Sequence, residues 1–301
     1  MNWIKQLKKL RRVMRKLLIK EITKLNKKKK IYLIVNDLGF NVIEPFKQKF
    51  PNNLFNAGVS EQNMMGMSAG IASEKFQVFA YSIANFSTFR CAEQIRNDVD
   101  YHNLSVTIVS VGSGLSYGNL GYTHHAIQDY ALMRSFPNML IVSPGNNSEL
   151  SSSLKFMTNN PQPYYLRIDK DETNQKINNN LQVKPGNIYK LFNGNKKKII
   201  LTTGNVQEIA RRINKKNYSI YSLPIWGKKT KKITFKYLSN FSKIITIEDH
   251  LEDGGFGSWV NECLNNSRKK IKLVHKFVSD KVISKVGSKD YLMKKYGPES
   301  T

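Results

Sequence analysis

Short runs of apolar and β-branched residues alternate with stretches of helical spacing from Ile31 onward. Five such runs occupy residues 31–35, 54–59, 78–83, 106–111 and 139–144. Near-continuous apolar strands are typical of a parallel sheet that helices cover on both faces. The pattern therefore predicts an open α/β domain over residues 31–180.

A polar, Asn-rich stretch over residues 169–187 then interrupts the pattern, with Pro185-Gly186 near its end. Such a stretch is typical of a linker. Four further apolar runs follow, at 198–203, 218–223, 243–248 and 271–277. They predict a second α/β domain over residues 186–301. The fold class that we expect is α/β, with two successive open domains built on mostly parallel sheets.

The first 30 residues form a separate, basic segment. Between Met14 and Leu25 the apolar positions recur at helical spacing, with Lys and Arg between them, at Leu17, Leu18, Ile22 and Leu25. This spacing predicts an amphipathic docking helix. Residues 1–13 continue the pattern, and two interpretations stay open for them: a basic helix on a membrane surface, or a solvated extension of the docking helix.

The net charge of +26 would ordinarily indicate nucleic acid or an anionic surface as a partner. Its distribution argues against that interpretation. Residues 1–30 carry 13 basic side chains against one acid and residues 181–301 carry 25 against 9, whereas residues 31–180 carry 10 against 12. No nucleic-acid-binding motif accompanies the charge. We therefore expect neither nucleic acid nor a membrane as the primary partner.

Two further features of composition narrow the class of protein. Cys91 and Cys263 lie far apart with no CxxC spacing, which argues against a disulfide framework and a structural zinc. No apolar run approaches the roughly 18 residues of a membrane span, and the N-terminus lacks the apolar stretch of a secretory signal. We expect a cytoplasmic protein with reduced thiols.

Ligands of open α/β sheets bind beyond the carboxyl ends of the strands, so the residues after each run are the candidates for a site. Glu61 follows the run that ends at Val59 and opens a helix. This position fits a functional carboxylate. It fits a simple helix cap as well, because a helix N-terminus favours an acid in its first turn.

The turn after residues 78–83 carries Phe86, Phe89 and Arg90. Aromatic residues three apart usually belong to a core. Beyond a strand end, however, they offer a flat apolar wall for a heteroaromatic ring.

A glycine-rich loop follows residues 106–111 and leads to the pair His124 and His125. Its glycines permit a tight backbone that brings a side chain close to a ligand. His125 and Asp129 have helical i, i+4 spacing, but no third ligand is evident, so we expect no metal site here and interpret the imidazoles as hydrogen-bonding groups for a polar substrate. Arg167, in the run YYLRI, either reaches an anionic substrate group or forms a surface ion pair.

Five segments, taken in order, resemble the transketolase family. They are NDLGF (36–40), NAGVSEQNMMGMSAGIA (56–72), YSIANFSTFRCAEQIRNDV (81–99), GLSYGNLGYTHHAIQDYALMR (114–134) and FPNMLIVSPGN (136–146). The segment KIITIEDHLEDGGFGSWV (243–260) is similar to the C-terminal domain of that family. The resemblance spans about residues 14–301 and looks, more narrowly, like the C-terminal subunit of split, two-subunit transketolases.

The resemblance implies a thiamine diphosphate enzyme, with a pyrimidine-binding domain over residues 31–180 and a transketolase C-terminal domain over residues 186–301. Glu61 matches the glutamate that hydrogen-bonds N1′ of the aminopyrimidine and favours the imino form that takes up the C2 proton. Phe86, Phe89 and Arg90 fall in the cofactor-binding region whose aromatic residues stack on that ring. The spacing does not choose between the two phenylalanines.

The same resemblance assigns the substrate contacts. His124 matches the histidine of the family's G-x-T-H turn and is, with Glu61, an expected catalytic residue that hydrogen-bonds substrate oxygens. His125 stands where Gln is common in relatives, and with Arg167 it completes the expected substrate-contacting set.

The family holds Mg²⁺ and the diphosphate with a Gly-Asp-Gly motif followed by Asn, and no Gly-Asp-Gly occurs in these 301 residues. The resemblance therefore implies a separate N-terminal subunit that supplies the Mg²⁺ and diphosphate site, in a heterotetramer or with a homodimer of this chain. The implied reaction transfers a two-carbon ketol unit between sugars or sugar phosphates.

Several alternatives stay open at this point. Leu120 stands where transketolases of sugar phosphates often carry an acid, which leaves the donor open. The Y-G-x-x-G-x-T-H-H arrangement of the turn is more similar to relatives in unusual-sugar or polysaccharide biosynthesis. The β subunit of 2-oxoacid dehydrogenase E1 fits the His-His turn less well, and deoxyxylulose-phosphate synthase normally keeps the diphosphate site in the same chain. A non-catalytic basic binding module is disfavoured by the near-neutral middle of the chain.

Overall fold

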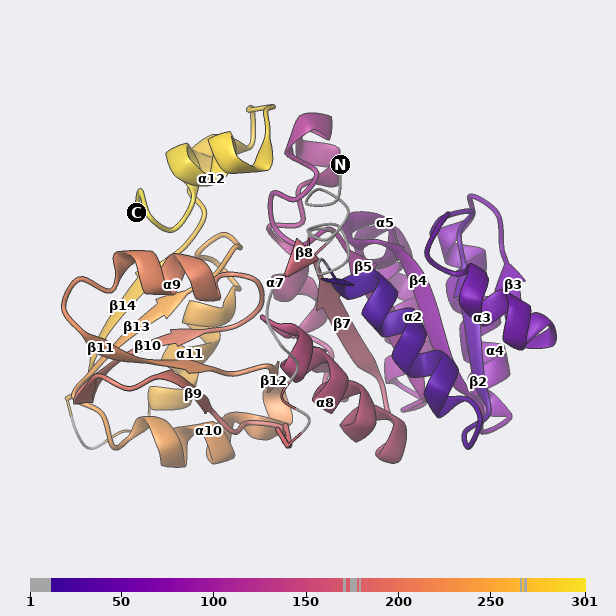
Figure 1. Ribbon diagram of the computed structural model, residues 1–301, viewed down its shortest axis with the longest axis horizontal. Coiled ribbons are helices and arrows are strands. Elements are labelled where there is room, and N and C mark those ends of the chain that lie inside the picture. Colours follow the sequence, from indigo (N-terminus) through magenta and orange to yellow (C-terminus); the bar gives the residue numbers. More distant parts are fainter. Residues whose placement is uncertain (1–11, 170–171, 174–177, 179, 266, 268–269) are drawn as a thin grey trace, which may run out of the picture.

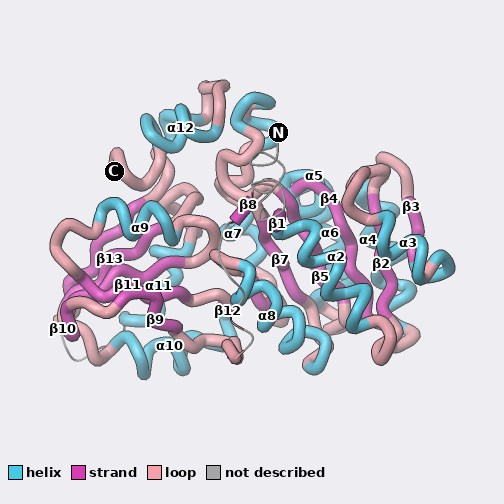
Figure 2. The backbone as a smooth tube through the Cα atoms, viewed as in Figure 1, coloured by secondary structure: helices cyan, strands magenta, loops and turns pink. Residues whose placement is uncertain are grey.

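Two α/β lobes lie side by side in the computed structural model, which describes residues 12–169, 172–173, 178, 180–265, 267 and 270–301. The N-terminal lobe is coloured indigo to magenta in Figure 1 and the C-terminal lobe orange to yellow. Each lobe is built on its own sheet. Figure 2 shows the strands of each sheet lying between helices, as the apolar runs predict.

The first sheet has seven strands in the order β12-β6-β7-β5-β4-β2-β3. Their bounds are β2 Ile31–Val35, β3 Leu54–Asn56, β4 Gln77–Ile83, β5 Val106–Val111, β6 Leu140–Val142, β7 Tyr164–Ile168 and β12 Ile225–Trp226. Neighbouring strands from β6 to β3 pair in parallel, whereas β12 pairs antiparallel with β6. The predicted parallel α/β class is confirmed.

Strand β12 joins the first sheet although it follows the predicted linker in sequence. Ile225 pairs with Val142, and Trp226 pairs with Ile141. The C-terminal part of the chain therefore contributes backbone hydrogen bonds to the N-terminal lobe, which ties the two lobes together.

Helices cover the first sheet on both faces. In chain order they are α2 Met14–Leu25, α3 Glu44–Lys49, α4 Glu61–Ser73, α5 Ala84–Thr88, α6 Ala92–Gln94, a π-helix Ile95–Asp100, α7 Asp129–Met133 and α8 Asn147–Asn159. The predicted docking helix is confirmed as α2, whose apolar side packs into the core beside α8.

The chain before α2 departs from the predicted helix. Residues Arg12–Val13 form strand β1, which pairs antiparallel with β8, Glu172–Thr173. The helical continuation is therefore wrong for residues 12 and 13, because their backbone bonds to β8 instead of to the next turn. The rest of the N-terminal extension, residues 1–11, lies outside the described residues.

The second sheet has five strands in the order β14-β13-β10-β11-β9. Its strands are β9 Tyr189–Phe192, β10 Asn195–Thr202, β11 Tyr218–Ser222, β13 Lys243–Ile247 and β14 Lys272–Lys276, and its helices are α9 Gln207–Ile213, α10 Lys231–Leu238, α11 Phe256–Leu264 and α12 Lys289–Tyr296. All pairs are parallel except that of β11 with β9. In the described part of the chain, no helix is long and apolar enough to cross a membrane.

A shared hydrophobic core joins the two lobes. The Trp226 ring centroid lies 5.1 Å from that of Trp259 on α11 and 5.1 Å from that of Tyr130 on α7. All three side chains are buried. The edge strand β12 of the first sheet and helix α7 are thereby packed against α11 of the second lobe.

Candidate functional site

Glu61 is the first residue of α4, beyond the carboxyl end of β3. Only 3% of its surface is exposed. Its Oε2 accepts a hydrogen bond from Arg90 Nη1 at 2.6 Å. The carboxylate thus sits at the positive end of a helix, as a capping acid would, and it also faces the turn that contains the predicted aromatic wall.

Phe86 lies between the acidic and the imidazole side chains of this region. The guanidinium carbon of Arg90 lies 4.7 Å from the centroid of the Phe86 ring, and the His124 ring lies 5.0 Å from it, edge to face. Phe89 is 47% exposed. Among the described residues, Phe86 therefore is the phenylalanine that links Glu61, through Arg90, to His124.

The loop that carries His124 is fixed to the Phe86 helix by one amide. Asn85 Nδ2 donates to the carbonyl oxygens of Thr123 at 3.1 Å and of His125 at 3.0 Å. Thr123 Oγ1 lies 2.9 Å from His124 Nδ1. Burial lowers the pKa of His124 from its ordinary 6.5, so its imidazole is neutral near pH 7 and offers one donor and one acceptor.

Two glycines of the loop are required by their surroundings. Gly112 has φ +93°, and a Cβ there would stand 2.1 Å from the Tyr117 ring. Gly114 has φ +56°, and a Cβ there would stand 2.6 Å from Asp249 Oδ2. The glycine-rich sequence therefore lets the histidine loop approach its own tyrosine and the second lobe closely.

His125 points inward. It is 1% exposed, its Nε2 lies 3.4 Å from the Gly118 carbonyl oxygen, and its Nδ1 is buried without a hydrogen-bond partner in the described structure. Burial lowers the pKa of His125. Of the two predicted substrate histidines, His124 is the one with a partly exposed ring.

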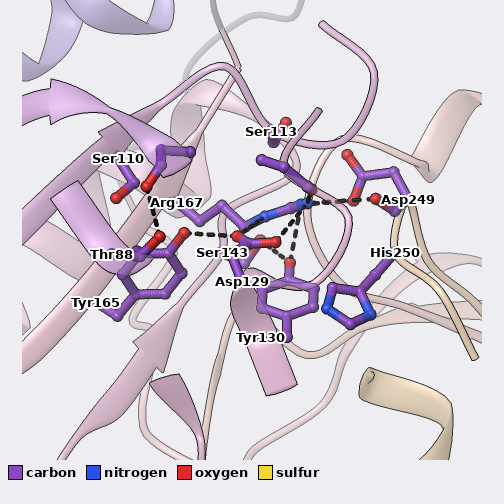
Figure 3. Close-up of polar contacts among 12 residues, drawn as sticks. Thr88, Ser110, Ser113, Asp129, Tyr130, Ser143, Tyr165, Arg167, Asp249 and His250 are labelled. Atoms are coloured by element: carbon purple, nitrogen blue, oxygen red, sulfur yellow. Dashed lines mark hydrogen bonds and ion pairs between the residues drawn. The ribbon is translucent and has the colours of Figure 1, made fainter. Parts of the chain in front are cut away.

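Arg167 is not placed as the sequence led us to expect. Its side chain is fully buried between the lobes, where Nε lies 2.6 Å from Asp129 Oδ2 and Nη1 lies 2.5 Å from Asp249 Oδ1 (Figure 3). Nη2 donates to the Ala126 carbonyl oxygen at 2.7 Å. The predicted surface ion pair is therefore wrong, because two buried carboxylates bind this guanidinium, which solvent does not reach. The contact of Arg167 with a substrate anion stays a prediction.

Further aromatic groups complete this ion-pair cluster, which we call the interlobe lock. Tyr165 Oη donates to Asp129 Oδ2 at 2.5 Å, and the Arg167 guanidinium lies 4.3 Å from the Tyr130 ring centroid. His250 stacks on Tyr130, with the ring centroids 5.2 Å apart (Figure 3). Because Ala126 follows the histidine pair directly, the interlobe lock also fixes the end of the histidine loop.

Two residues of this region, Asn85 and Asp249, were not predicted from the sequence. Asp249 belongs to the segment IEDH, whose acids gave a signal only through family resemblance. Asn85 lies in the turn directly before Phe86, but a single polar residue in a turn gives no sequence pattern that would identify it as functional. Asn85 and Asp249 both bind groups that are distant in sequence: Asn85 binds the carbonyl oxygens of Thr123 and His125, and Asp249 binds Arg167.

Neither a metal cluster nor a reactive thiol is found in the described residues. There, no group of three or more His, Cys, Asp and Glu side chains is arranged to hold a metal ion. Cys91 and Cys263 are buried and unpaired with each other, and burial raises the pKa of each thiol to about 12. Their thiols are therefore un-ionised and poorly nucleophilic at neutral pH.

Residues 13–176 match the family model described as transketolase, pyrimidine binding domain, which covers more than half of the chain. This chain belongs to the transketolase family. The matched region contains Glu61, Phe86, Arg90 and the histidine loop, so the site described above lies within the family's pyrimidine-binding domain.

Relatives of similar length place the chain within the family. It is 30% identical over 260 residues to a subunit of the apulose-4-phosphate transketolase of Actinobacillus succinogenes, covering 85% of this chain and 84% of that protein. It is 33% identical over 258 residues to a putative transketolase C-terminal section of Methanocaldococcus jannaschii, covering 84% and 81%. The chain is therefore similar to transketolase C-terminal subunits over most of its length.

A solved structure agrees with this placement. The chain superposes on a split-gene transketolase solved as an inactive β4 tetramer, with a TM-score of 0.79 and 27% identity, covering 95% of this chain and 93% of that one. The predicted resemblance to the C-terminal subunit of a split transketolase is confirmed.

Proposed function

We propose that this chain is the pyrimidine-binding subunit of a thiamine diphosphate-dependent transketolase, and that it turns over only with an N-terminal subunit. The observation that carries the proposal is the arrangement of Arg90 on Glu61 and Phe86. A planar cationic donor there both bonds to the buried carboxylate and lies over the aromatic face.

The residues fit the aminopyrimidine end of the cofactor. A protonated aminopyrimidine is also a planar N–H donor, and it can take both contacts that Arg90 makes. Phe86 offers a ring face for stacking. Glu61 offers a carboxylate that is screened from water, where a hydrogen bond to a ring nitrogen is stronger than in solvent. Arg90, 48% exposed at its side chain, has solvent to move into.

Each side chain then has a distinct task. Glu61 holds the proton shared with N1′ of the pyrimidine, and Phe86 fixes the plane of that ring. His124 hydrogen-bonds oxygens of the sugar, since it lies at the edge of Phe86 and is neutral near pH 7. When bound, thiamine diphosphate supplies the nucleophilic carbon that carries the two-carbon unit.

The charged end of the cofactor needs a second polypeptide in this proposal. No Gly-Asp-Gly occurs in the 301 residues, so we assign the Mg²⁺ and the diphosphate mainly to an N-terminal subunit. The relative that is named as one subunit of a transketolase, and the β4 tetramer described as inactive, support this division. We propose a heterotetramer of the two subunits, with a homodimer of this chain as the other candidate assembly.

The substrates are proposed as sugars or sugar phosphates. Leu120, 55% exposed in the histidine loop, offers no hydrogen-bond acceptor to a donor hydroxyl. This favours a donor that lacks a hydroxyl at that position or binds it elsewhere, as in unusual-sugar metabolism.

Reconstitution tests the proposal. Ketol transfer is measured with this chain alone, with the N-terminal subunit alone and with both, each with thiamine diphosphate and Mg²⁺ present. We expect turnover only in the mixture, and turnover lost when Glu61→Ala replaces the wild-type chain. Turnover by this chain alone, or full activity of the Glu61→Ala mixture, would contradict the proposal.

A further inference from the structure

A lysine-lined hollow lies on the N-terminal lobe, and Glu61 is not among its lining residues. It lies between α2 and the segment that ends in α3, which are side by side in Figure 1; it is open to solvent and has a volume of about 600 Å³. Its lining residues are Lys16, Lys20, Thr23, Lys24, Lys27, Asn41, Val42, Pro45 and Lys49. We call it the lysine hollow.

Helix α2 has one apolar face and one lysine-rich face. Leu17, Leu18 and Ile22 are buried against the sheet, whereas Lys20 and Lys24 are exposed on the side of the hollow. Lysines four residues apart on one helix face repel one another and lower helix stability. The sequence therefore keeps an arrangement that costs stability in the isolated chain.

Neutralising partners are missing from the hollow. No Asp or Glu is among its lining residues. Within the described ranges, the lysines that lie within 4 Å of a carboxylate are Lys231 and Lys289, both outside the hollow. Five lysines from two walls thus line one space, and none of the carboxylates in the described structure is among its lining residues.

Apolar side chains also line the hollow, and Val42 and Pro45 are two of them. A concave site with apolar walls and a few charged groups is the usual form of a small-molecule site. Lysine is a strongly hydrated point charge that suits phosphate without demanding a fixed geometry.

From this geometry we propose that the lysine hollow binds a phosphate-bearing anion. The proposal is independent of the thiamine diphosphate site, because it uses none of the residues assigned there. The phosphate comes either from a free polyphosphate or from an anionic lipid headgroup, which present the same chemistry to the lysines.

The experiment uses the full chain and two probes. Inorganic tripolyphosphate is titrated by calorimetry, and vesicles of phosphatidylcholine with or without phosphatidylglycerol are used in co-sedimentation. The test variant is Lys16→Gln, Lys20→Gln, Lys24→Gln and Lys27→Gln combined. The matched control combines Lys228→Gln, Lys229→Gln, Lys232→Gln and Lys236→Gln, which are exposed and lie in the other lobe.

Both variants lose the same net charge and keep residues 1–13. A difference in probe affinity between them is therefore due to the lysines of the hollow. We expect at least one probe to bind the wild-type chain, with affinity falling on the order of tenfold or more in the test variant and little in the control. Binding of tripolyphosphate alone identifies a free ligand, and binding of phosphatidylglycerol vesicles alone identifies a headgroup.

Two results would overturn the proposal: equal losses in both variants, or no binding of either probe by the wild-type chain. Should the test variant fail to fold, as judged by circular dichroism, the single change Lys49→Gln on the opposite wall replaces it, with Lys47→Gln beside it on α3 as control. A selective loss with Lys49→Gln supports the hollow, and equal behaviour of the two single variants contradicts it.

Discussion

Arg90 donates its Nη1–H to Oε2 of Glu61 across 2.6 Å, and this pair occupies the place where the proposed pyrimidine would bind. The carboxylate is buried, whereas the arginine is half-exposed. Such a pair contributes on the order of 1 kcal/mol, because solvent screens the arginine. Arg90 is therefore a counter-ion that a cofactor ring can displace at modest cost.

Displacement of Arg90 by the cofactor can be tested by removing the arginine. Arg90→Gln removes the competing cation, so we expect thiamine diphosphate to bind the reconstituted enzyme several-fold more tightly, on the order of 1 kcal/mol. Isothermal titration of the cofactor measures the change. Arg96→Gln, an exposed arginine further along the same segment, is the control. Weaker cofactor binding in Arg90→Gln would show that Arg90 holds the cofactor instead of making way for it.

Phe86 and Phe89 give a matched pair of variants. Because the Phe86 ring contacts Arg90 and His124, Phe86→Ala is expected to raise the cofactor KM about tenfold, as loss of one aromatic stack implies. Phe89→Ala, at the more exposed ring, is expected to change it little. Cofactor titrations of the initial rate measure both. The reverse order of effects would assign the stack to Phe89.

The acid limb of the activity profile is set by His124 in this account. Burial lowers the pKa of His124 below 6.5, so the ring stays neutral until the pH falls below that value. We expect kcat/KM for the sugar donor to fall only under more acid conditions, where the imidazole becomes charged and loses its acceptor. His124→Asn should flatten that limb. An acid limb unchanged by the substitution would exclude His124 as its source.

The interlobe lock makes a stability prediction. Arg167→Met leaves Asp129 and Asp249 buried without their partner, so we expect a loss of about 3–5 kcal/mol in the free energy of unfolding. Urea unfolding measures it. Arg212→Gln, which breaks the exposed pair with Glu299, should cost at most about 1 kcal/mol. Similar losses for the two variants would mean that the lock contributes no more than a surface pair.

Much of the fold could be predicted because apolar periodicity reports which side of an element is buried. The runs 31–35 and 106–111 are strands with those same bounds, and the amphipathic spacing gave α2 as it is. Strand β12 could not be predicted, because two residues carry no pattern and their partner lies in the other lobe. The periodicity of apolar residues indicates which residues are buried, but not which other residues they pack against.

Some residues of the candidate site could likewise be predicted from the sequence, and others could not. Glu61 and His124 stood out because each follows a strand and belongs to a motif. Arg167 was misinterpreted since an arginine within an apolar run does not reveal its counter-ion, and Asp249 lies 82 residues further along the chain. The contact between Arg90 and Glu61 also joins separate segments, so only the folded chain brings the pair together.

In the proposed enzyme, the Glu61 carboxylate activates the bound cofactor. The rate of hydrogen-deuterium exchange at C2 of thiamine diphosphate, followed by NMR in the reconstituted complex, tests it without any choice of sugar. We predict that Glu61→Gln, which keeps the shape but not the charge, slows exchange by about 10²–10⁴-fold while the complex still assembles. An exchange rate equal to that of the wild-type complex, at saturating cofactor, would contradict this role of Glu61.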